Sequence, residues 1–320
     1  MKPDMTGEIE DLGQVMLARD GTRDSFIEIL SRLDLRPPVI IKPNWSTSVT
    51  FTESEILDWT LSALDCEVIV VESYAFYRSP ILKNSEGLSD EDLERKLLAQ
   101  KRDDLRNNDK WFLDISGISD VLEKHDVKYI NLSEELWAKR VTDSETIKDA
   151  VEKCFEPVRT EVLYSMVPSK LYDLRGGTLL SLAKPKVAHG AIGVTLTIKN
   201  LFGMISTPFR GKFHGGNNEL LNDSIVDINR IYHSLFNVRG VIESVFSTSV
   251  MGEDLLKSRI YRNLGYIWGS NSTIELDSMV TAQLGLNPED IGHLSHVARI
   301  LGQWTQQSVE LGRKRVIDFK

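Results

Sequence analysis

The stretch TLLSLAKPKVAHGAIGVTLTIKNLF, residues 178–202, contains a short apolar run, then a loop with several cations, then an apolar segment with helical spacing. A short apolar run followed by turn residues is typical of a buried strand. The stretch therefore predicts a strand, a basic loop and a helix in succession. Its positive charge is local, because the whole chain has a net charge of -9.

The same alternation of short apolar runs and amphipathic segments continues on both sides of this stretch. It is the pattern of a largely parallel sheet whose strands are connected by helices. The apolar runs predict strands at residues 39–41, 68–71, 129–132, 178–182, 240–245 and 265–268. Helical patterns are found at residues 53–64, 118–124, 194–202, 224–236, 273–284 and 288–301. We therefore expect an α/β fold of mostly parallel sheets flanked by helices.

The length of 320 residues suits two lobes, and we expect a cleft between them. We assign residues 1–175 to an N-terminal α/β lobe and residues 176–320 to a C-terminal α/β lobe with the KPKVAH and IKNLFG motifs. Residues 85–110 are polar, with opposite charges at helical spacing, and predict an exposed helical insertion in the first lobe. A lid is the alternative, because aromatic residues precede this insertion.

The acidic composition argues against nucleic acid or an anionic membrane as the main partner, because both select for a basic surface. The N-terminus lacks the apolar core of a signal peptide, and no run of about 18 apolar residues is present to span a bilayer. We expect a soluble, cytoplasmic protein whose partner is a small anionic metabolite. The oligomeric state stays open, a homodimer included.

Metal and cofactor motifs are sparse. Cys66 and Cys154 are too few for an iron–sulfur cluster within this chain. The pair His293 and His296, with Asp290 three residues before His293, has a helical spacing that could seat a metal. No further ligand is apparent, so we expect solvent-exposed histidines and no metal site. The motifs GxGxxG, GxxxxGK(S/T), HExxH, GxSxG and CxxC are absent. The sequence does not identify an organic cofactor.

Polar residues follow the predicted strands. In open α/β sheets the ligand crevice lies beyond the carboxyl ends of the strands, so these residues should meet at one rim. Lysine and arginine there would hold an anion, and arginine can bind a carboxylate or phosphate with two hydrogen bonds. The residues expected to bind substrate are Lys42, Asn44, Glu72, Lys184, Lys186, Arg210, Glu243 and Asn271.

The expected catalytic residues are Lys199, His189, Asn200 and His214. Lys199 lies among apolar residues, and burial near other cations would lower its pKa enough for acid–base work near neutral pH. His189 precedes a predicted helix whose first amides could bind an anion. Asn200 would stabilise a developing oxyanion, and His214 would titrate near the substrate.

Each of these assignments has a plainer alternative. Lys199 would instead reach water or neutralise Glu243 or Asp227. His214 would be a hydrogen-bonding surface residue in a glycine-rich loop. Asp227 and Asp277 lie within apolar helical patterns, and we expect them to be ion-pair partners of the site lysines.

Several segments together resemble the domain-of-unknown-function family DUF362. They are IIKPNW (40–45), VIVVES (68–73), LAKPKVAHG (182–190), TLTIKNLFGMI (195–205), KFHG (212–215), IVDIN (225–229) and the closing segment 269–294. The resemblance implies an α/β fold and a buried basic motif, but no settled reaction. Some members carry ferredoxin-like cysteine clusters, which this chain lacks, so an electron-transfer role would need a separate iron–sulfur partner.

The chain departs from the family pattern at two acidic positions. Glu243 stands where the resemblance leads us to expect aspartate, and Asn271 stands where it predicts the aspartate of a Gly-Thr/Ser-Asp turn. If those acids bind a metal or another cation in relatives, the resemblance does not imply that property for this chain.

From these observations we expect an enzyme of the isomerase or lyase class. It would act on a small carboxylate or phosphate metabolite by proton transfer at carbon, as an isomerase, racemase, lyase or cyclase does. The alternatives are a non-catalytic binding or carrier module for an anionic metabolite or cofactor, and an accessory to an iron–sulfur redox system.

Overall fold

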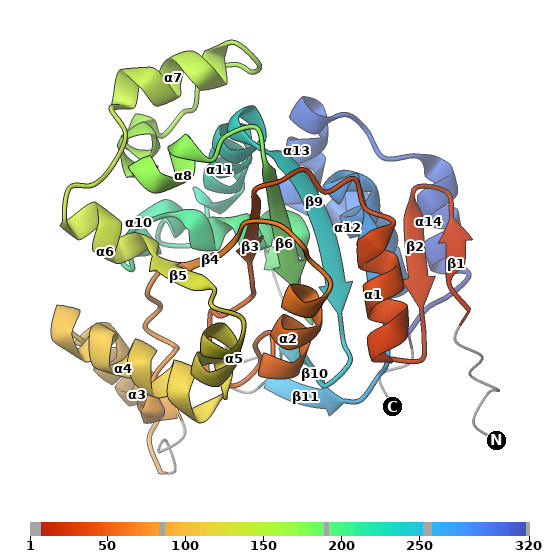
Figure 1. Cartoon of the computed structure of the whole chain (residues 1–320), viewed down its shortest axis with the longest axis horizontal. Coiled ribbons are helices and arrows are strands. Elements are labelled where there is room, and N and C mark those ends of the chain that lie inside the picture. The colour runs from red at the N-terminus through yellow and green to blue at the C-terminus, as the bar shows by residue number, and fades with distance from the viewer. Residues whose placement is uncertain (1–7, 83–86, 189–191, 252–257, 318–320) are drawn as a thin grey trace.

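A computed structural model describes residues 8–82, 87–188, 192–251 and 258–317. Within these residues the main sheet has eight strands in the order β1-β2-β12-β9-β6-β3-β4-β5 (Figure 1). Their bounds are β1 Glu10–Leu12, β2 Val15–Ala18, β3 Val39–Lys42, β4 Val68–Glu72, β5 Lys128–Asn131, β6 Thr178–Ala183, β9 Asn237–Glu243 and β12 Ile267–Ser270. The six predicted strands are all present, and the mixed α/β fold is confirmed.

The strands run in two blocks. β9, β6, β3, β4 and β5 are parallel neighbours, whereas β12, β2 and β1 continue the sheet with antiparallel pairing. From β3 the chain proceeds outward through β4 to β5, and from β6 it proceeds the other way to β9. The order thus reverses between β3 and β6. Such a switch point opens a crevice at the carboxyl ends of the two strands, where α/β proteins bind ligands.

The expected boundary at residue 175 does not divide the chain into two sheets. β6, from the second half, pairs with β3 of the first half over four residue pairs, from Val39 with Thr178 to Lys42 with Ser181. Both halves therefore share one sheet, and the candidate site lies at its rim.

Helices cover both faces of the sheet because alternate strand residues point to opposite sides. Val39 and Ile41 pack toward α1 Arg23–Ser31, α2 Ser54–Ser62 and α5 Ile118–Lys124. Ile40 packs toward the other face, which is covered by α7 Ser144–Glu152, α11 Leu221–Leu235, α12 Thr273–Gln283 and α13 Gly292–Leu301 (Figure 1). Shorter helices are α6 Leu132–Trp137, α8 Ser169–Asp173 and α14 Gln306–Arg313. No helix in the described part of the chain is long and apolar enough to cross a membrane.

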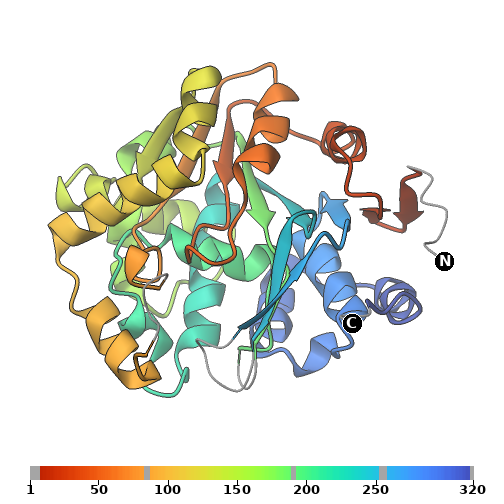
Figure 2. The ribbon, with the colours of Figure 1, turned by 90° about the horizontal axis from the view of Figure 1, so that it is seen from below.

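A second sheet extends from the carboxyl ends of the main strands (Figure 2). Its strand order is β11-β10-β7-β8. Its strands are β7 Lys186–Val187, β8 Val194–Thr195, β10 Ser247–Met251 and β11 Ser258–Arg262. The prediction of a helix from residue 194 is therefore wrong at its start. Val194 and Thr195 pair with β7, and this tertiary pairing overrides the local helical pattern. The helix α9 begins later and spans Thr197–Asn200.

The polar insertion forms two helices, α3 Asp90–Leu98 and α4 Arg102–Ile115. It is not wholly exposed, because Leu93, Leu97 and Leu105 are buried against Tyr74 and Phe76 in a separate apolar cluster. The charged residues face water while the leucines dock the insertion onto the segment that follows β4. The insertion is thus a packed element of the domain edge.

Two adjacent leucines of α3 test this docking. Leu97 has no exposed surface, whereas Leu98 is 52% exposed. We predict that Leu97→Ala lowers the free energy of unfolding by about 2–5 kcal/mol, because it leaves a cavity in a packed cluster. Leu98→Ala should change it by less than about 0.5 kcal/mol. Urea unfolding measures both values, and equal effects of the two variants would contradict the docked arrangement.

Candidate functional site

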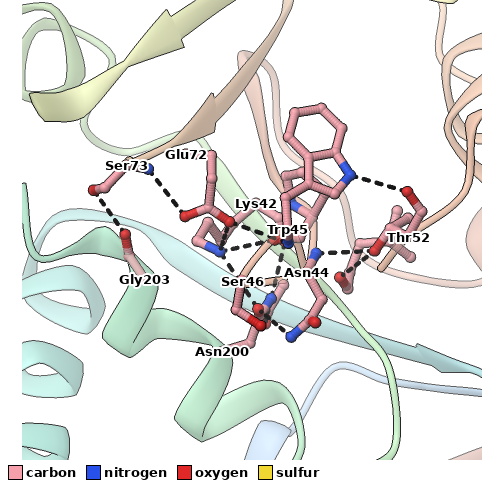
Figure 3. A network of polar contacts seen from close by, with 12 residues as sticks. Lys42, Asn44, Trp45, Ser46, Thr52, Glu72, Ser73, Asn200 and Gly203 are labelled. Atoms are coloured by element: carbon pink, nitrogen blue, oxygen red, sulfur yellow. Dashed lines mark hydrogen bonds and ion pairs between the residues drawn. The ribbon is translucent and has the colours of Figure 1, made fainter. Parts of the chain in front are cut away.

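A buried ion pair marks the carboxyl ends of β3 and β4. Nζ of Lys42 lies 2.8 Å from Oε2 of Glu72, and the two side chains are only 1% and 3% exposed (Figure 3). The parallel pairing of the two strands brings these residues to one rim. Lys42 also donates to the carbonyl oxygen of Pro43 at 2.7 Å. Its pKa is lowered by burial, and the attraction of Glu72 opposes this shift.

The side-chain amide of Asn200 joins three elements at this point. Its Nδ2 donates to the carbonyl oxygen of Lys42 at 3.0 Å and to Oγ of Ser181 on β6 at 3.1 Å. Its Oδ1 accepts from Nδ2 of Asn44 at 3.1 Å and from Nζ of Lys42 at 3.4 Å (Figure 3). Both N–H groups of the amide are therefore used within the protein. Asn200 acts as a brace for β3, β6 and α9, and the expected oxyanion donor is already occupied.

A glycine lets the segment after α9 approach the ion pair. Gly203 lies in the 3-10 helix Leu201–Met204, where an added Cβ would stand 2.7 Å from Nζ of Lys42 and 2.9 Å from Oε1 of Glu72. Oγ of Ser73 donates to the carbonyl oxygen of Gly203 at 2.9 Å. Glycine is thus required at this position of the KNLFG motif, because any side chain would collide with the buried pair.

Lys186 lies at the start of β7, beside Asn44. Its Nζ donates to Oδ1 of Asn44 at 2.7 Å, to the carbonyl oxygen of Thr50 at 3.1 Å and to Oγ of Ser46 at 3.3 Å. Among the described residues no carboxylate lies within 4 Å of it. Burial, and then the neighbouring ammonium groups led by that of Lys199, lowers the pKa of Lys186 to about 7.

Lys184 is paired with two carboxylates. Its Nζ lies 2.5 Å from Oε2 of Glu53 and 2.8 Å from Oε1 of Glu243, and neither Lys184 nor Glu243 has exposed side-chain surface. Burial raises the pKa of Glu243, the ammonium of Lys184 opposes this shift and the Glu53 carboxylate adds to it. The expected substrate-binding residues Lys184 and Glu243 thus neutralise each other, so this lysine is not a free anion ligand.

Lys199 lies on α9, and its side chain is partly exposed. Nζ donates to Oγ1 of Thr195 at 3.2 Å. Burial lowers the pKa of Lys199 to about 8. The expectation that burial shifts this lysine toward neutral pH is therefore supported by its position. Neither Glu243 nor Asp227 neutralises it, because their partners are Lys184 and Arg230.

Arg210 and His214 lie near Lys199. Arg210 donates from Nη2 to the carbonyl oxygen of Tyr74 at 2.9 Å, while its buried Nε has no partner among the described residues. Burial lowers the pKa of Arg210 to about 10. Nδ1 of His214 lies 2.9 Å from Oδ1 of Asn218. Burial also lowers the pKa of His214, and the positive charges of Lys199 and Arg210 add to this effect.

Positive charge exceeds negative charge in this cluster. Lys42 is matched by Glu72, and Lys184 by its two glutamates. A further buried pair joins Arg78 to Asp109, which sequence reasoning missed because Asp109 lies in the polar insertion. Three cations have no carboxylate within 4 Å in the described ranges, namely Lys186, Lys199 and Arg210. Of the three, Lys186 is buried, whereas the side chains of Lys199 and Arg210 are partly exposed. A charge without a partner is costly where it is removed from water.

Not all predicted site residues join the cluster. Asn271 lies at the opposite rim, where its Oδ1 accepts from the backbone N–H of Asp34 at 2.8 Å. The prediction was wrong because β12 runs antiparallel to β9, so its carboxyl end points away from the site. His189 falls outside the described residues.

His293 is fully buried on α13, which corrects the expected exposed histidine. The helix turns this face toward the core, and burial lowers the pKa of His293 to about 3. His296 is 38% exposed, as expected for the solvent side. In the described part of the chain no group of three or more His, Cys, Asp or Glu residues could hold a metal ion.

Asp277 and Asp227 are not ion-pair partners of the site lysines. The carboxylate of Asp277 accepts from the backbone N–H groups of Thr197 at 3.0 Å and Ile198 at 2.8 Å, at the start of α9. Asp227 accepts from the backbone N–H groups of Arg159 and Thr160. Burial raises the pKa of Asp277 to about 7, against these hydrogen bonds.

Two cavities lie away from the lysines. One of about 380 Å³ is lined by residues of α4, β5 and α6, including Asp109 and Glu134. The other, of about 410 Å³, lies at the amino end of β4 and includes Cys66 and His125. Lys186 and Lys199 line neither of them, so the basic cluster is a separate feature of the fold.

The buried pair of Lys42 and Glu72 allows a test of the site's electrostatics. We predict that Glu72→Gln lowers the free energy of unfolding by about 3–5 kcal/mol, because it leaves the Lys42 ammonium buried without a countercharge. Glu28→Gln, which removes one member of an exposed pair with Arg32, should cost less than about 1 kcal/mol. Urea unfolding monitors both variants.

The double variant Lys42→Met with Glu72→Gln provides the second half of this test. It removes both charges, so it should be more stable than Glu72→Gln alone. If the double variant is less stable than the single one, the cost does not come from the uncompensated ammonium.

Comparisons with known proteins identify one family. Searches among curated proteins and among solved structures find no match. The sequence model of one family, described as a domain of unknown function, matches residues 39–282, which extend from β3 into α12 and include the whole basic cluster. The chain therefore belongs to the DUF362 family.

Proposed function

We propose that this protein is an enzyme that binds a small carboxylate or phosphate compound at the carboxyl ends of β3 and β6 and transfers a proton at carbon. The supporting observation is the group of three cations, the buried Lys186 and the partly buried Lys199 and Arg210, that have no carboxylate partner in the described ranges. The topological switch point is the place where α/β proteins commonly bind ligands, and cations there favour an anionic one.

The hydrogen-bond and ion-pair partners of each residue indicate its role in the proposed reaction. Arg210 donates to the anion from its unpartnered Nε, and Lys186 attracts the anion by its charge, which no carboxylate in the described ranges neutralises. Lys199, with a pKa of about 8, is present in both protonation states near neutral pH, as an acid–base catalyst requires. His214 is the second titrating group beside it. The ion pair of Lys42 and Glu72 and the amide of Asn200 fix the geometry around them. The reaction class is that of an isomerase or lyase.

One observation favours the second candidate, a binding or carrier module. Nζ of Lys186 already donates to three protein oxygens, which fix the position of this positive charge. A fixed charge suits a site that holds an anion without converting it. Native mass spectrometry of freshly purified protein separates the two functions. A stoichiometric ligand that exchanges slowly supports a carrier, whereas a weakly held compound that is consumed supports an enzyme. The third candidate, an iron–sulfur accessory, needs a partner protein that carries the cluster.

Anion binding should depend on pH in a defined direction. The pKa values of Lys186 and Lys199, about 7 and about 8, are lowered, so both lysines lose their protons as pH rises through 7 to 8. An anion binds the protonated forms. We predict that sulfate affinity, measured by calorimetry from pH 6 to 9, falls with rising pH by up to about tenfold per unit for each lysine. Sulfate is chosen because it keeps its charge over this range.

The variant Lys186→Met is the control for this pH dependence. It removes the lysine with the lower pKa, so the loss of affinity should begin at higher pH and be less steep. Affinity in the wild type that does not change between pH 6 and 9 would contradict the assignment of these lysines to the anion.

Proton transfer at carbon can be followed as deuterium exchange. We predict that the protein catalyses loss of the carbon-bound proton signal from at least one of pyruvate, L-lactate, L-alanine and dihydroxyacetone phosphate in D₂O, followed by proton NMR. Lys199→Met should abolish the exchange and retain cooperative unfolding, because the side chain lies at the edge of the core. Lys212→Met, an exposed lysine of the same region, is the matched control and should retain it. Exchange that persists in Lys199→Met would argue against an acid–base role.

A further inference from the structure

The four lysines of the cluster, of which Lys42, Lys184 and Lys186 are buried and Lys199 is partly exposed, differ in what their ammonium groups contact. Lys42 and Lys184 face carboxylates at 2.8 Å or less. Lys186 donates to three oxygens, one for each of its protons. Among the described residues, Lys199 has one hydrogen-bond partner, the hydroxyl of Thr195 at 3.2 Å, and no carboxylate within 4 Å. Of these four side chains, only Lys199 can lose a proton without breaking an ion pair or a saturated set of hydrogen bonds.

The surroundings of Lys199 also favour the neutral amine. The charges of Lys186 and Arg210 and the partly buried imidazole of His214 lie in the same cluster. His293 is fully buried on α13, and neither of its ring nitrogens has a hydrogen-bond partner among the described residues. Burial lowers the pKa of His293, and the positive charge of Lys199 adds to this shift. A lysine amine becomes a nucleophile toward carbonyl carbon when it is desolvated or lies beside other cations, because both favour its neutral form.

We propose that Lys199 forms a covalent imine with a 2-oxo acid, whose carboxylate accepts a hydrogen bond from the unpartnered Nε of Arg210 and is attracted by the charge of Lys186. A 2-oxo acid places a carbonyl carbon next to a carboxylate, which matches one nucleophilic amine beside two unpaired cations. This inference rests on the proposed function, because it names the substrate class of the same site. It also changes the role of Lys199 from acid–base catalyst to nucleophile, because the imine formed on it withdraws electrons from the substrate. His214 then takes the proton from carbon.

The covalent step balances without any further reactant. The neutral amine of Lys199 adds to the carbonyl carbon, which gives a carbinolamine. The former carbonyl oxygen then leaves as water, with the two protons that the ammonium form of Lys199 loses overall, and a protonated imine remains. The protonated imine withdraws electrons from the carbon next to the imine carbon, so a proton on that neighbouring carbon becomes acidic. Proton transfer at carbon follows directly from this intermediate.

Reductive trapping tests the imine. The wild-type protein is incubated with pyruvate or glyoxylate and sodium borohydride, which converts an imine into a stable secondary amine. We expect one adduct per chain in the intact mass, and peptide mapping should place it on Lys199. Lys212→Gln, which alters an exposed lysine nearby, should label as the wild type does. This mapping on the wild type gives an answer even if a Lys199 variant folds poorly.

Two variants separate a nucleophile from a structural cation. Lys199→Arg keeps the positive charge and lacks a nucleophilic amine, so it should retain sulfate binding and lose the trapped adduct. Lys199→Gln should also lose the adduct. No adduct with either probe, or equal labelling in Lys199→Arg and in the wild type, would overturn the imine. If deuterium exchange continues without a trapped adduct, the imine is wrong while proton transfer stands; if exchange is also absent, the proposed function fails as well.

Discussion

The amide of Asn200 holds together three parts of the chain that carry the positive charges of the site. It donates to the backbone of Lys42 and to Ser181, and it accepts from the Lys42 ammonium and from Asn44. A carboxylate here could accept but not donate, and it would neutralise a lysine. An apolar side chain would leave the Lys42 ammonium and carbonyl without these contacts. A neutral amide therefore ties α9 to both strands while it preserves the excess of positive charge.

The sheet topology explains why so many cations meet at this point. At the switch point, β3 and β6 lie side by side, and the strands that follow them lie on opposite sides of the sheet. The loops after both strands therefore begin next to each other, at the place where α/β proteins commonly bind ligands. Lys42 and Lys184 lie beside carboxylates from neighbouring segments, which neutralise the charges of these two lysines. Lys186 lies two residues after Lys184 and donates only to neutral oxygens. The residual charge thus follows from where each strand ends.

Sequence reasoning located most of the rim but not its far side. Strand ends marked by Lys42, Glu72 and Lys184 were predictable, because short apolar runs define strands and polar residues follow them. The direction of β12 was not, since pairing with β9 is decided by residues far away in the sequence, and Asn271 was misplaced for that reason. The pairing of Arg78 with Asp109 has the same origin: no local pattern connects a loop after β4 with a polar insertion.

The buried aspartates show how the chain keeps Lys199 unpaired. Asp277 is a buried acid close to α9 in sequence-distant α12, and it could have neutralised a lysine. Its two oxygens instead accept from the first backbone N–H groups of α9 and from the hydroxyl of Thr197. Negative charge at a helix start stabilises free N–H groups, so the carboxylate positions the helix that carries Lys199 without contacting the ammonium. The same helix is thus anchored by an anion at its beginning and left cationic at its end.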